Sequence, residues 1–307
     1  MIDGLRPRVR ALAAWCTLAA LLLCGEGTVA QRHVTANAAF DVGILRVERF
    51  GNPAARSIVF IPAMFCGAWQ WNAQIDALSP TYDVLVVTLP GFDGRPAIEG
   101  EDLMQRAAQS LHVLLTTHRL NRPIVVGHSL GGTISIYYAE RFPHDMTGVV
   151  TVEGGYPIAP TQTARDAYVA KSTAAYKGID RSAVGAVIRK QTLQYTITSK
   201  ADVDAVEPLA ARSDPGAIIA WMRSALTLDL TPELQRIRVP LTVIIPFDSD
   251  IDPYQGFQSK AAKLAAYVRW VAKVPEPKVV LVTPSRHFVM FDQPVTFQQD
   301  LETALLR

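Results

Sequence analysis

The sequence contains few cysteines and lacks the clustered cysteine and histidine residues of metal sites. Only three cysteines occur in 307 residues, and Cys16 and Cys24 both lie within residues 1–30. No HExxH motif is present either, so the sequence indicates no metal site. We expect the remaining cysteine, Cys66, to be a small buried hydrophobic residue rather than a nucleophile.

The sequence also lacks the features of nucleic-acid and nucleotide binding. Its 30 Lys and Arg residues nearly balance 28 Asp and Glu residues, which leaves a net charge of +2 and no basic patch. The glycine-containing stretch at 91–100 has no phosphate-binding lysine, and a G-x-G-x-x-G motif is absent. Internal repeats and low-complexity tracts are absent as well. We therefore expect no nucleic-acid partner.

The first thirty residues have the pattern of a secretory signal peptide. Arg6, Arg8 and Arg10 precede an uncharged apolar run, and small residues lead to Ala30. The run is short for a membrane span. We expect residues 1–30 to be cleaved near Ala30, which would place the protein outside the cytoplasm, in the periplasm or secreted, without a membrane span. The alternative is an uncleaved N-terminal anchor.

Apolar runs typical of strands alternate with helical patterns along most of the chain. Runs such as "DVLVVTL" predict strands covered on both faces, and helical spacing separates them. This alternation predicts an α/β fold with a mostly parallel, doubly wound sheet. Gly51, Asn52 and Pro53 predict a hairpin turn between the first strands.

One segment interrupts the alternation. Residues 156–235 are mostly compatible with helix, contain Ala-rich pieces and show no clear strand. We therefore expect a core formed by residues 31–155 and 236–307, with 156–235 inserted as a helical cap.

The segment "PIVVGHSLGGTIS" holds the most informative motif. Gly127-His128-Ser129-Leu130-Gly131 fits G-x-S-x-G, with an apolar strand before it and a helical pattern after it. In that context a strained turn exposes the serine hydroxyl above the sheet edge, and both flanking positions have no room for a side chain. Ser129 is the predicted nucleophile.

A serine nucleophile needs a base and an acid that orients the base. Of the six histidines, His287 is the predicted base, because its loop follows the last predicted strand and opens at the same edge of the sheet. Asp248 is the preferred acid, since it lies just beyond a strand that runs to about residue 245. Asp250 and Glu153 remain open as alternatives.

An oxyanion hole needs two backbone N–H groups. Leu130 supplies one as the residue after the nucleophile. Met64, in the loop after the strand "SIVFIP", is the predicted source of the other.

These motifs resemble those of the α/β-hydrolase fold family across essentially the whole chain after residue 30. The turn "GHSLGG" and the loop "SRHFVMFDQP" match the family pattern. Pro62 and Ala63 stand where the family usually has His-Gly, and the usual Gly-x-x-Asp would place the acid at Ser249. The resemblance implies a serine hydrolase, often with a helical cap, that needs no cofactor.

Together these features predict an exported hydrolase of carboxylic esters or lactones that acts on a small-molecule substrate through an acyl-enzyme. An amidase or C–C hydrolase that uses the same triad is the first alternative. A non-catalytic binding module on a hydrolase scaffold is the alternative of another class.

Overall fold

The computed structural model describes residues 31–307, so the predicted signal peptide at 1–30 lies outside the described residues. Eight strands form one sheet in the order β1-β2-β4-β3-β5-β6-β7-β8. The pairs β1–β2 and β2–β4 are antiparallel, and the other pairs are parallel. The strands are β1 (Ala38–Val42), β2 (Leu45–Gly51), β3 (Ser57–Ile61), β4 (Asp83–Thr88), β5 (Ile124–His128), β6 (Gly148–Val152), β7 (Leu241–Pro246) and β8 (Pro277–Val282).

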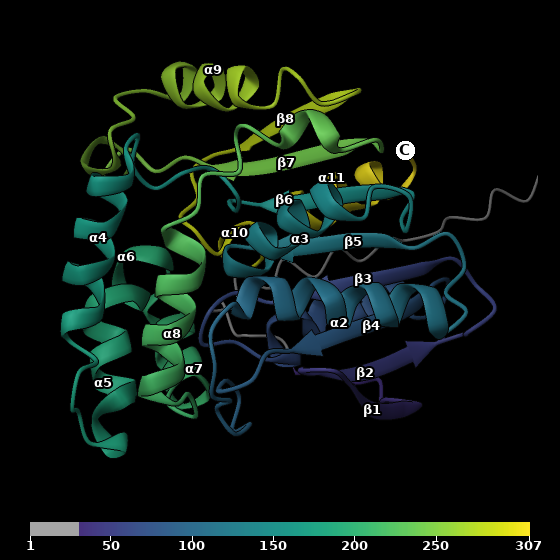
Figure 1. Ribbon diagram of the computed structural model, residues 1–307, viewed down its shortest axis with the longest axis horizontal. Coiled ribbons are helices and arrows are strands. Elements are labelled where there is room, and N and C mark those ends of the chain that lie inside the picture. The colour runs from purple at the N-terminus through teal and green to yellow at the C-terminus, as the bar shows by residue number, and fades with distance from the viewer. Residues whose placement is uncertain (1–30) are drawn as a thin grey trace, which may run out of the picture.

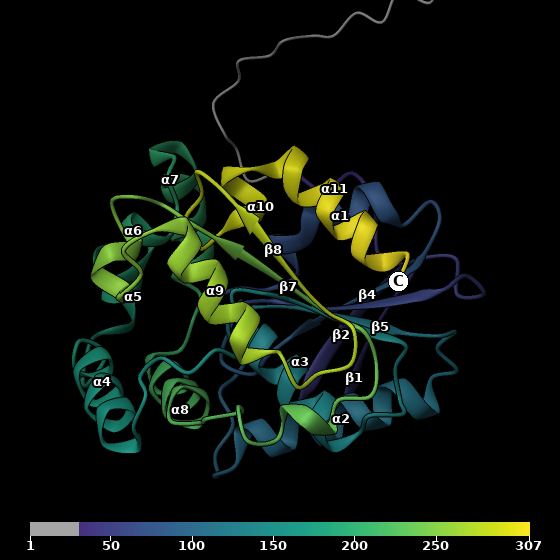
Figure 2. The ribbon, with the colours of Figure 1, turned by 90° about the horizontal axis from the view of Figure 1, so that it is seen from above.

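Helices cover both faces of the sheet. Figure 2 shows α1 and α11 on one face and α2, α3 and α9 on the other. Every residue of β3, β4, β5, β6 and β7 is buried, as expected for strands covered on both sides. The predicted α/β fold with a mostly parallel, doubly wound sheet is therefore confirmed. The core helices are α1 (Asn72–Leu78), α2 (Leu103–Thr117), α3 (Leu130–Arg141), α9 (Lys260–Trp270), α10 (Val289–Asp292) and α11 (Pro294–Leu305).

The predicted hairpin at Gly51, Asn52 and Pro53 is wrong. The strands that flank these residues, β2 and β3, do not pair, because β4 lies between them. The hairpin instead joins β1 to β2 through a turn at Gly43, which has a φ of 54°. A turn signal marks where a strand ends, but the packing of the whole sheet decides which strands become neighbours.

The chain between β6 and β7 forms a cap that contains helices and no strand. Figure 1 shows these helices gathered beyond the carboxyl ends of the parallel strands. Within residues 31–307, no helix of the cap or the core combines the length and apolar composition needed to cross a bilayer. The cap helices are α4 (Gln162–Ala174), α5 (Val184–Ile188), α6 (Gln194–Thr196), α7 (Lys200–Ala210) and α8 (Pro215–Leu226).

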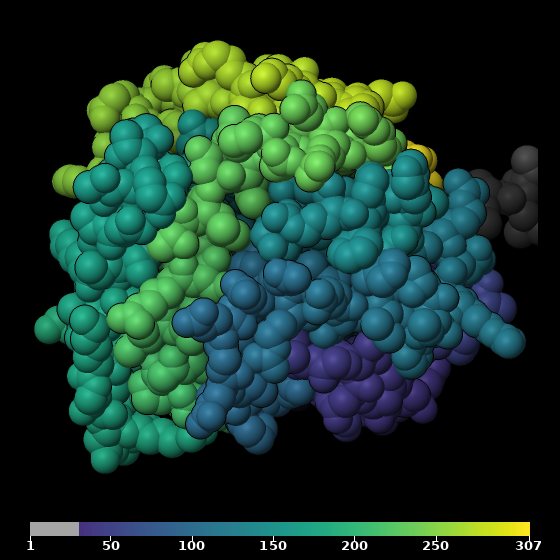
Figure 3. Space-filling model, in the orientation of Figure 1, coloured from purple at the N-terminus to yellow at the C-terminus, as the bar shows by residue number. Residues whose placement is uncertain are grey.

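Hydrogen bonds attach the cap to the loop that follows β4. Trp221 Nε1 donates to the Pro90 carbonyl at 3.1 Å, and the backbone N–H of Asp214 donates to the Gly91 carbonyl at 2.7 Å. In Figure 3 the green surface of this part of the cap lies directly against the blue surface of the core. The cap is therefore seated on the loops of the carboxyl edge.

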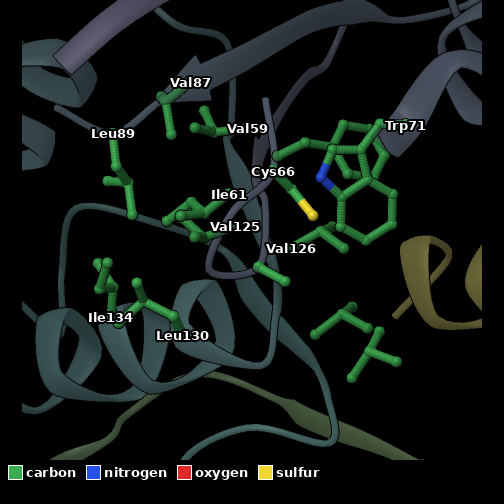
Figure 4. Packing of buried hydrophobic residues seen from close by; sticks show 14 of the residues in the cluster. Val59, Ile61, Cys66, Trp71, Val87, Leu89, Val125, Val126, Leu130 and Ile134 are labelled. Carbon is green, nitrogen blue, oxygen red and sulfur yellow. The ribbon is translucent and has the colours of Figure 1, made fainter. Parts of the chain in front are cut away.

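The core between sheet and helices is built from aliphatic and aromatic side chains. Val59, Val125, Val126 and Trp71 are all fully buried, and Figure 4 shows Cys66 within this packing. Burial, and secondarily the charge of Asp93, raises the pKa of the Cys66 thiol well above its usual value. A buried thiol that keeps its proton is a poor nucleophile.

A buried carboxyl on α3 predicts a pH-dependent stability. Glu140 is 3% exposed, and burial, opposed by Arg141, raises its pKa from 4.5 to about 8. The native state therefore holds a proton between pH 4.5 and about 8 that the unfolded chain has released. Stability from this group falls as pH rises through that window.

We expect Glu140→Gln to remove this pH dependence. In urea unfolding, the free energy of unfolding of the variant, relative to that of the wild type, should increase by about 2–4 kcal/mol between pH 5 and pH 9. The exposed Glu302→Gln is the matched control and should leave the difference unchanged. A Glu140→Gln protein that tracks the wild type at both pH values would contradict the assignment.

Candidate active site

The serine of the G-x-S-x-G motif occupies the turn between β5 and α3. Ser129 has φ 53° and ψ −114°, a strained conformation for a residue with a side chain. Its backbone N–H donates to the Val152 carbonyl at 2.9 Å, so the turn is attached to the end of β6. The hydroxyl-bearing residue therefore lies at the carboxyl edge of the sheet, and the N-terminus of α3 begins immediately after it.

The two glycines of the motif are required by close backbone contacts. A Cβ atom at Gly127 would lie 2.2 Å from the Gly131 carbonyl oxygen. A Cβ atom at Gly131 would lie 2.1 Å from the Ile61 carbonyl oxygen at the end of β3. Backbone cannot give way as a flexible side chain can, so only glycine fits at both positions.

His287 lies in the loop between β8 and α10, at the same edge. Its Nδ1 atom is 2.6 Å from Oε2 of Glu153, the residue that directly follows β6. A carboxylate only accepts hydrogen bonds, so Nδ1 carries the proton and Nε2 keeps its lone pair. This is the tautomer that a general base at Nε2 requires.

The structure does not place Asp248, the preferred acid, against His287. Asp248 Oδ2 accepts a hydrogen bond from Arg286 Nε at 3.3 Å, and its Oδ1 accepts one from the backbone N–H of Asp250 at 2.8 Å. The Asp250 side chain is exposed. Of the three candidate carboxylates, the one that contacts the imidazole is Glu153.

The strand order explains this correction. β6 is the direct neighbour of β5, whereas β7 is one strand farther away. The residue after β6 therefore lies closer to the Ser129 turn than the residues after β7. The chain after β7 turns back on itself, and the backbone N–H of Asp248 donates to Asp252 Oδ2 at 2.7 Å.

The Ser129 hydroxyl and the His287 imidazole are not hydrogen-bonded to each other in this structure. Within residues 31–307, no hydrogen bond joins Ser129 Oγ to His287 Nε2. His128, the residue before Ser129 in the chain, contacts His287, and the centroids of the two rings lie 4.6 Å apart. Catalytic hydrogen bonds are often long without substrate, and rotation of the serine side chain repositions its hydroxyl.

His128 supports the loop that carries His287. Its Nε2 lies 3.0 Å from the His287 carbonyl oxygen, so Nε2 carries the proton. The side chain is fully buried, and this burial, together with His287, lowers the pKa of His128 well below its usual value. The neutral His128 side chain therefore donates a hydrogen bond that fixes the backbone carbonyl of His287. The sequence motif alone did not indicate this role.

Two backbone N–H groups at the site have no acceptor within the described residues. Leu130 is the first residue of α3, and Met64 lies in the loop after β3; neither N–H donates to another group of residues 31–307. The loop is held by Gln70, whose Oε1 accepts from the Ala63 N–H at 2.8 Å. Phe65, with φ 67°, turns the chain immediately after Met64.

Glu153 also contacts a buried lysine, which sequence reasoning missed. Lys263 Nζ lies 2.5 Å from Glu153 Oε1 and 2.6 Å from Asp252 Oδ1. Burial alone would raise the pKa of Glu153, but the Lys263 ammonium and the hydrogen bond to His287 outweigh it and lower that pKa. Glu153 is therefore ionised at neutral pH and can stabilise an imidazolium at His287.

A signal for this lysine was present in the sequence. The buried residues of α9 are Lys263, Tyr267 and Trp270, at spacings of four and three. A lysine in the apolar stripe of a helix marks a position where a buried partner of opposite charge is expected.

No cluster of three potential His, Cys, Asp or Glu metal ligands occurs within residues 31–307. The chemistry of the described site is that of a hydroxyl, an imidazole, a carboxylate and two backbone donors.

Comparison with known families decides what kind of protein carries this site. The model of the alpha/beta hydrolase family matches residues 58–298. The chain belongs to this family. The match covers the strained serine turn, Glu153 and His287, and the resemblance expected from the motifs is thereby confirmed.

Individual relatives of this hydrolase carry several names. It is 30% identical to the 2-succinyl-6-hydroxy-2,4-cyclohexadiene-1-carboxylate synthase of Serratia proteamaculans (strain 568) over 58% of this chain and 71% of that protein. It is 26% identical to the pimeloyl-(acyl-carrier protein) methyl ester esterase of Vibrio atlanticus (strain LGP32) over 56% of this chain and 67% of that protein.

Solved structures share its fold. The enol-lactonase of Burkholderia xenovorans LB400 superimposes with a TM-score of 0.70 at 17% identity, over 88% of this chain and all of that one. At this identity the likeness concerns the fold alone.

Proposed function

We propose that this hydrolase cleaves carboxylic esters, including lactones, of small molecules through a Ser129-His287-Glu153 triad. The observation that carries the proposal is the 2.6 Å contact between His287 Nδ1 and Glu153 Oε2. It leaves Nε2 as the free base on a loop at the edge where the half-buried Ser129 lies.

The proposed reaction follows from the position of each group. His287 Nε2 takes the Ser129 proton as Oγ attacks the ester carbonyl carbon, and the C=O electrons move onto the carbonyl oxygen. The N–H groups of Met64 and Leu130 donate to that oxyanion. The C–O bond breaks when the leaving alcohol receives the proton from His287. Water, deprotonated by the same imidazole, then releases the acid from Ser129.

Two of the three reported names are consistent with this bond type, whereas the Serratia proteamaculans relative is named as a synthase. The Vibrio atlanticus relative is named as a methyl ester esterase, and the Burkholderia xenovorans neighbour as an enol-lactonase. Both names describe cleavage of a carboxylic ester. We extend only the bond type, and not the substrates, to this chain.

A panel of matched chromogenic substrates tests the proposal. p-Nitrophenyl esters from acetyl to decanoyl should be hydrolysed, whereas p-nitroanilides of the same acyl groups and a β-diketone should react at least about a hundredfold more slowly. Turnover of anilide or diketone without ester turnover would favour the amidase or C–C hydrolase alternatives. No turnover of any substrate would favour the binding module.

Free imidazole also hydrolyses nitrophenyl esters, so the panel needs a histidine control. His118 stacks on Phe40 with ring centroids 4.8 Å apart, at the end of α2. We expect His118→Ala to retain wild-type rates and His287→Ala to lose them. Equal rates in both variants would identify the hydrolysis as background.

We also propose that the protein is exported, on the basis of the charged, apolar and small-residue pattern of residues 1–30. N-terminal sequencing of protein recovered from a periplasmic fraction should give a start at Gln31. Recovery of the uncleaved chain from the membrane fraction would support the anchor alternative.

A further inference from the structure

A lysine is enclosed in the fold directly behind the acid of the site. The Lys263 side chain is 1% exposed, and its ammonium lies between Glu153 Oε1 and Asp252 Oδ1, at 2.5 and 2.6 Å. These two carboxylates come from different loops, one after β6 and one after β7. Lysine is almost never fully buried without such partners.

The lysine determines which oxygen of Glu153 is available. Glu153 Oε1 is bound to Lys263 Nζ, and Oε2 faces His287 Nδ1 at 2.6 Å. Each oxygen of the Glu153 carboxylate therefore has a partner of its own, Lys263 for Oε1 and His287 for Oε2. A side chain held at both oxygens cannot turn away from the imidazole.

The cluster also controls the charge that the imidazole experiences. Glu153 and Asp252 carry two negative charges when ionised and Lys263 carries one positive charge, so the fully ionised set has a net charge of −1. Burial raises the pKa of Asp252, and the hydrogen bonds from Asp248 and Lys263 oppose that shift. The other titratable groups that face it are the buried Tyr267 and its neighbour Tyr156, and burial raises the pKa of Tyr267 well above its usual value. The neutral His128 adjoins His287 from the other side.

We propose that Lys263 is a positioning residue of the active site: it orients Glu153 toward His287 and cancels the charge of Asp252. The ester-hydrolase function proposed above is assumed. Lys263 touches neither the substrate nor the reacting atoms, and it acts through Glu153. Asp252, which occupies the loop where an acid was expected, serves as the counter-ion of this lysine.

Substitution of Lys263 removes a positive charge near His287, and substitution of Asp252 removes a negative one, so the two variants should have opposite effects. Lys263→Met leaves two buried carboxylates, which favours the imidazolium and should move the acid limb of the kcat/KM profile upward by about one pH unit. Asp252→Asn leaves Glu153 neutralised by Lys263 and should move the limb downward. Loss of orientation at Glu153 should lower kcat about 10–100-fold in Lys263→Met.

The double variant Lys263→Met/Asp252→Asn separates positioning from folding. It restores a net charge of −1, so the acid limb should return to within about 0.3 pH units of the wild type. A lysine that only fills space would give variants with reduced stability and unmoved limbs. Thermal unfolding of each variant supplies that comparison. The double variant has one buried carboxylate fewer than Lys263→Met, in which two carboxylates have lost their lysine.

The experiment distinguishes failure of this inference from failure of the proposed function. Unmoved limbs in active Asp252→Asn and double variants would overturn the role of Lys263 alone. A wild-type protein without ester turnover would overturn the proposed function. In that case NMR titration of the His287 ring protons still tests the charge cluster, with the same opposite shifts expected and their absence counting against it.

Discussion

Ser129→Ala is expected to lower ester hydrolysis by about 10⁴-fold or more and to abolish labelling by a fluorophosphonate probe. The reason is that Ser129 supplies the attacking oxygen in the proposed reaction, while the backbone donors and the imidazole remain in place. Labelling is read on a gel and hydrolysis by nitrophenolate release. The melting temperature should stay near that of the wild type, because alanine keeps the same backbone turn.

The exposed Ser182 in the cap offers a matched control. Its hydroxyl bonds only to Asp180, away from the sheet edge. Ser182→Ala should retain both labelling and turnover. If Ser129→Ala continued to hydrolyse esters at the wild-type rate, the nucleophile would have to be another group, and the buried Cys66 could be tested next by substitution.

Glu153→Gln is expected to lower kcat by roughly 10²–10⁴-fold. Glutamine retains the size of the side chain but loses the charge that stabilises the His287 imidazolium in the proposed reaction. It also presents an amide that can donate, so it no longer enforces the Nδ1–H tautomer. The measurement is steady-state hydrolysis of the best ester of the panel, and KM should change much less than kcat.

Asp248→Asn is the control that tests the corrected assignment. Asp248 contacts Arg286 and not the imidazole, so its loss should cost less than about tenfold, or ~1.4 kcal/mol in the barrier. A severe loss in Asp248→Asn together with near-wild-type Glu153→Gln would reverse the assignment and return the acid to the loop after β7.

Local sequence patterns predicted the parts of this site that depend on neighbouring residues in the chain. The Ser129 turn needs only a strand, a helix and two glycines in succession, and Gly127 and Gly131 meet backbone atoms as expected. His287 follows the last strand, and all parallel strands end at one edge. The prediction that the backbone N–H groups of Leu130 and Met64 lie at this edge follows from their positions directly after the serine and after β3.

Other parts depended on which segments become neighbours in space. The hairpin predicted at Gly51 failed because β4 separates β2 from β3. Asp248 was preferred over Glu153 for a similar reason, since several carboxylates follow strands and the sequence does not show which one contacts His287. Lys263 was missed because its partners come from other parts of the chain. Glu153 is 110 residues away, and Asp252 lies on a separate loop.

The sequence by itself determined that this chain forms a doubly wound α/β sheet with a serine on a strained turn and a histidine at the same edge. Periodicity, glycine placement and chain order are local properties, and they suffice for those features. Only the tertiary structure decided that Glu153 contacts the imidazole and that Lys263 pairs with it. Contacts between distant side chains depend on strand order and packing, because only the folded sheet brings those groups within a few ångströms.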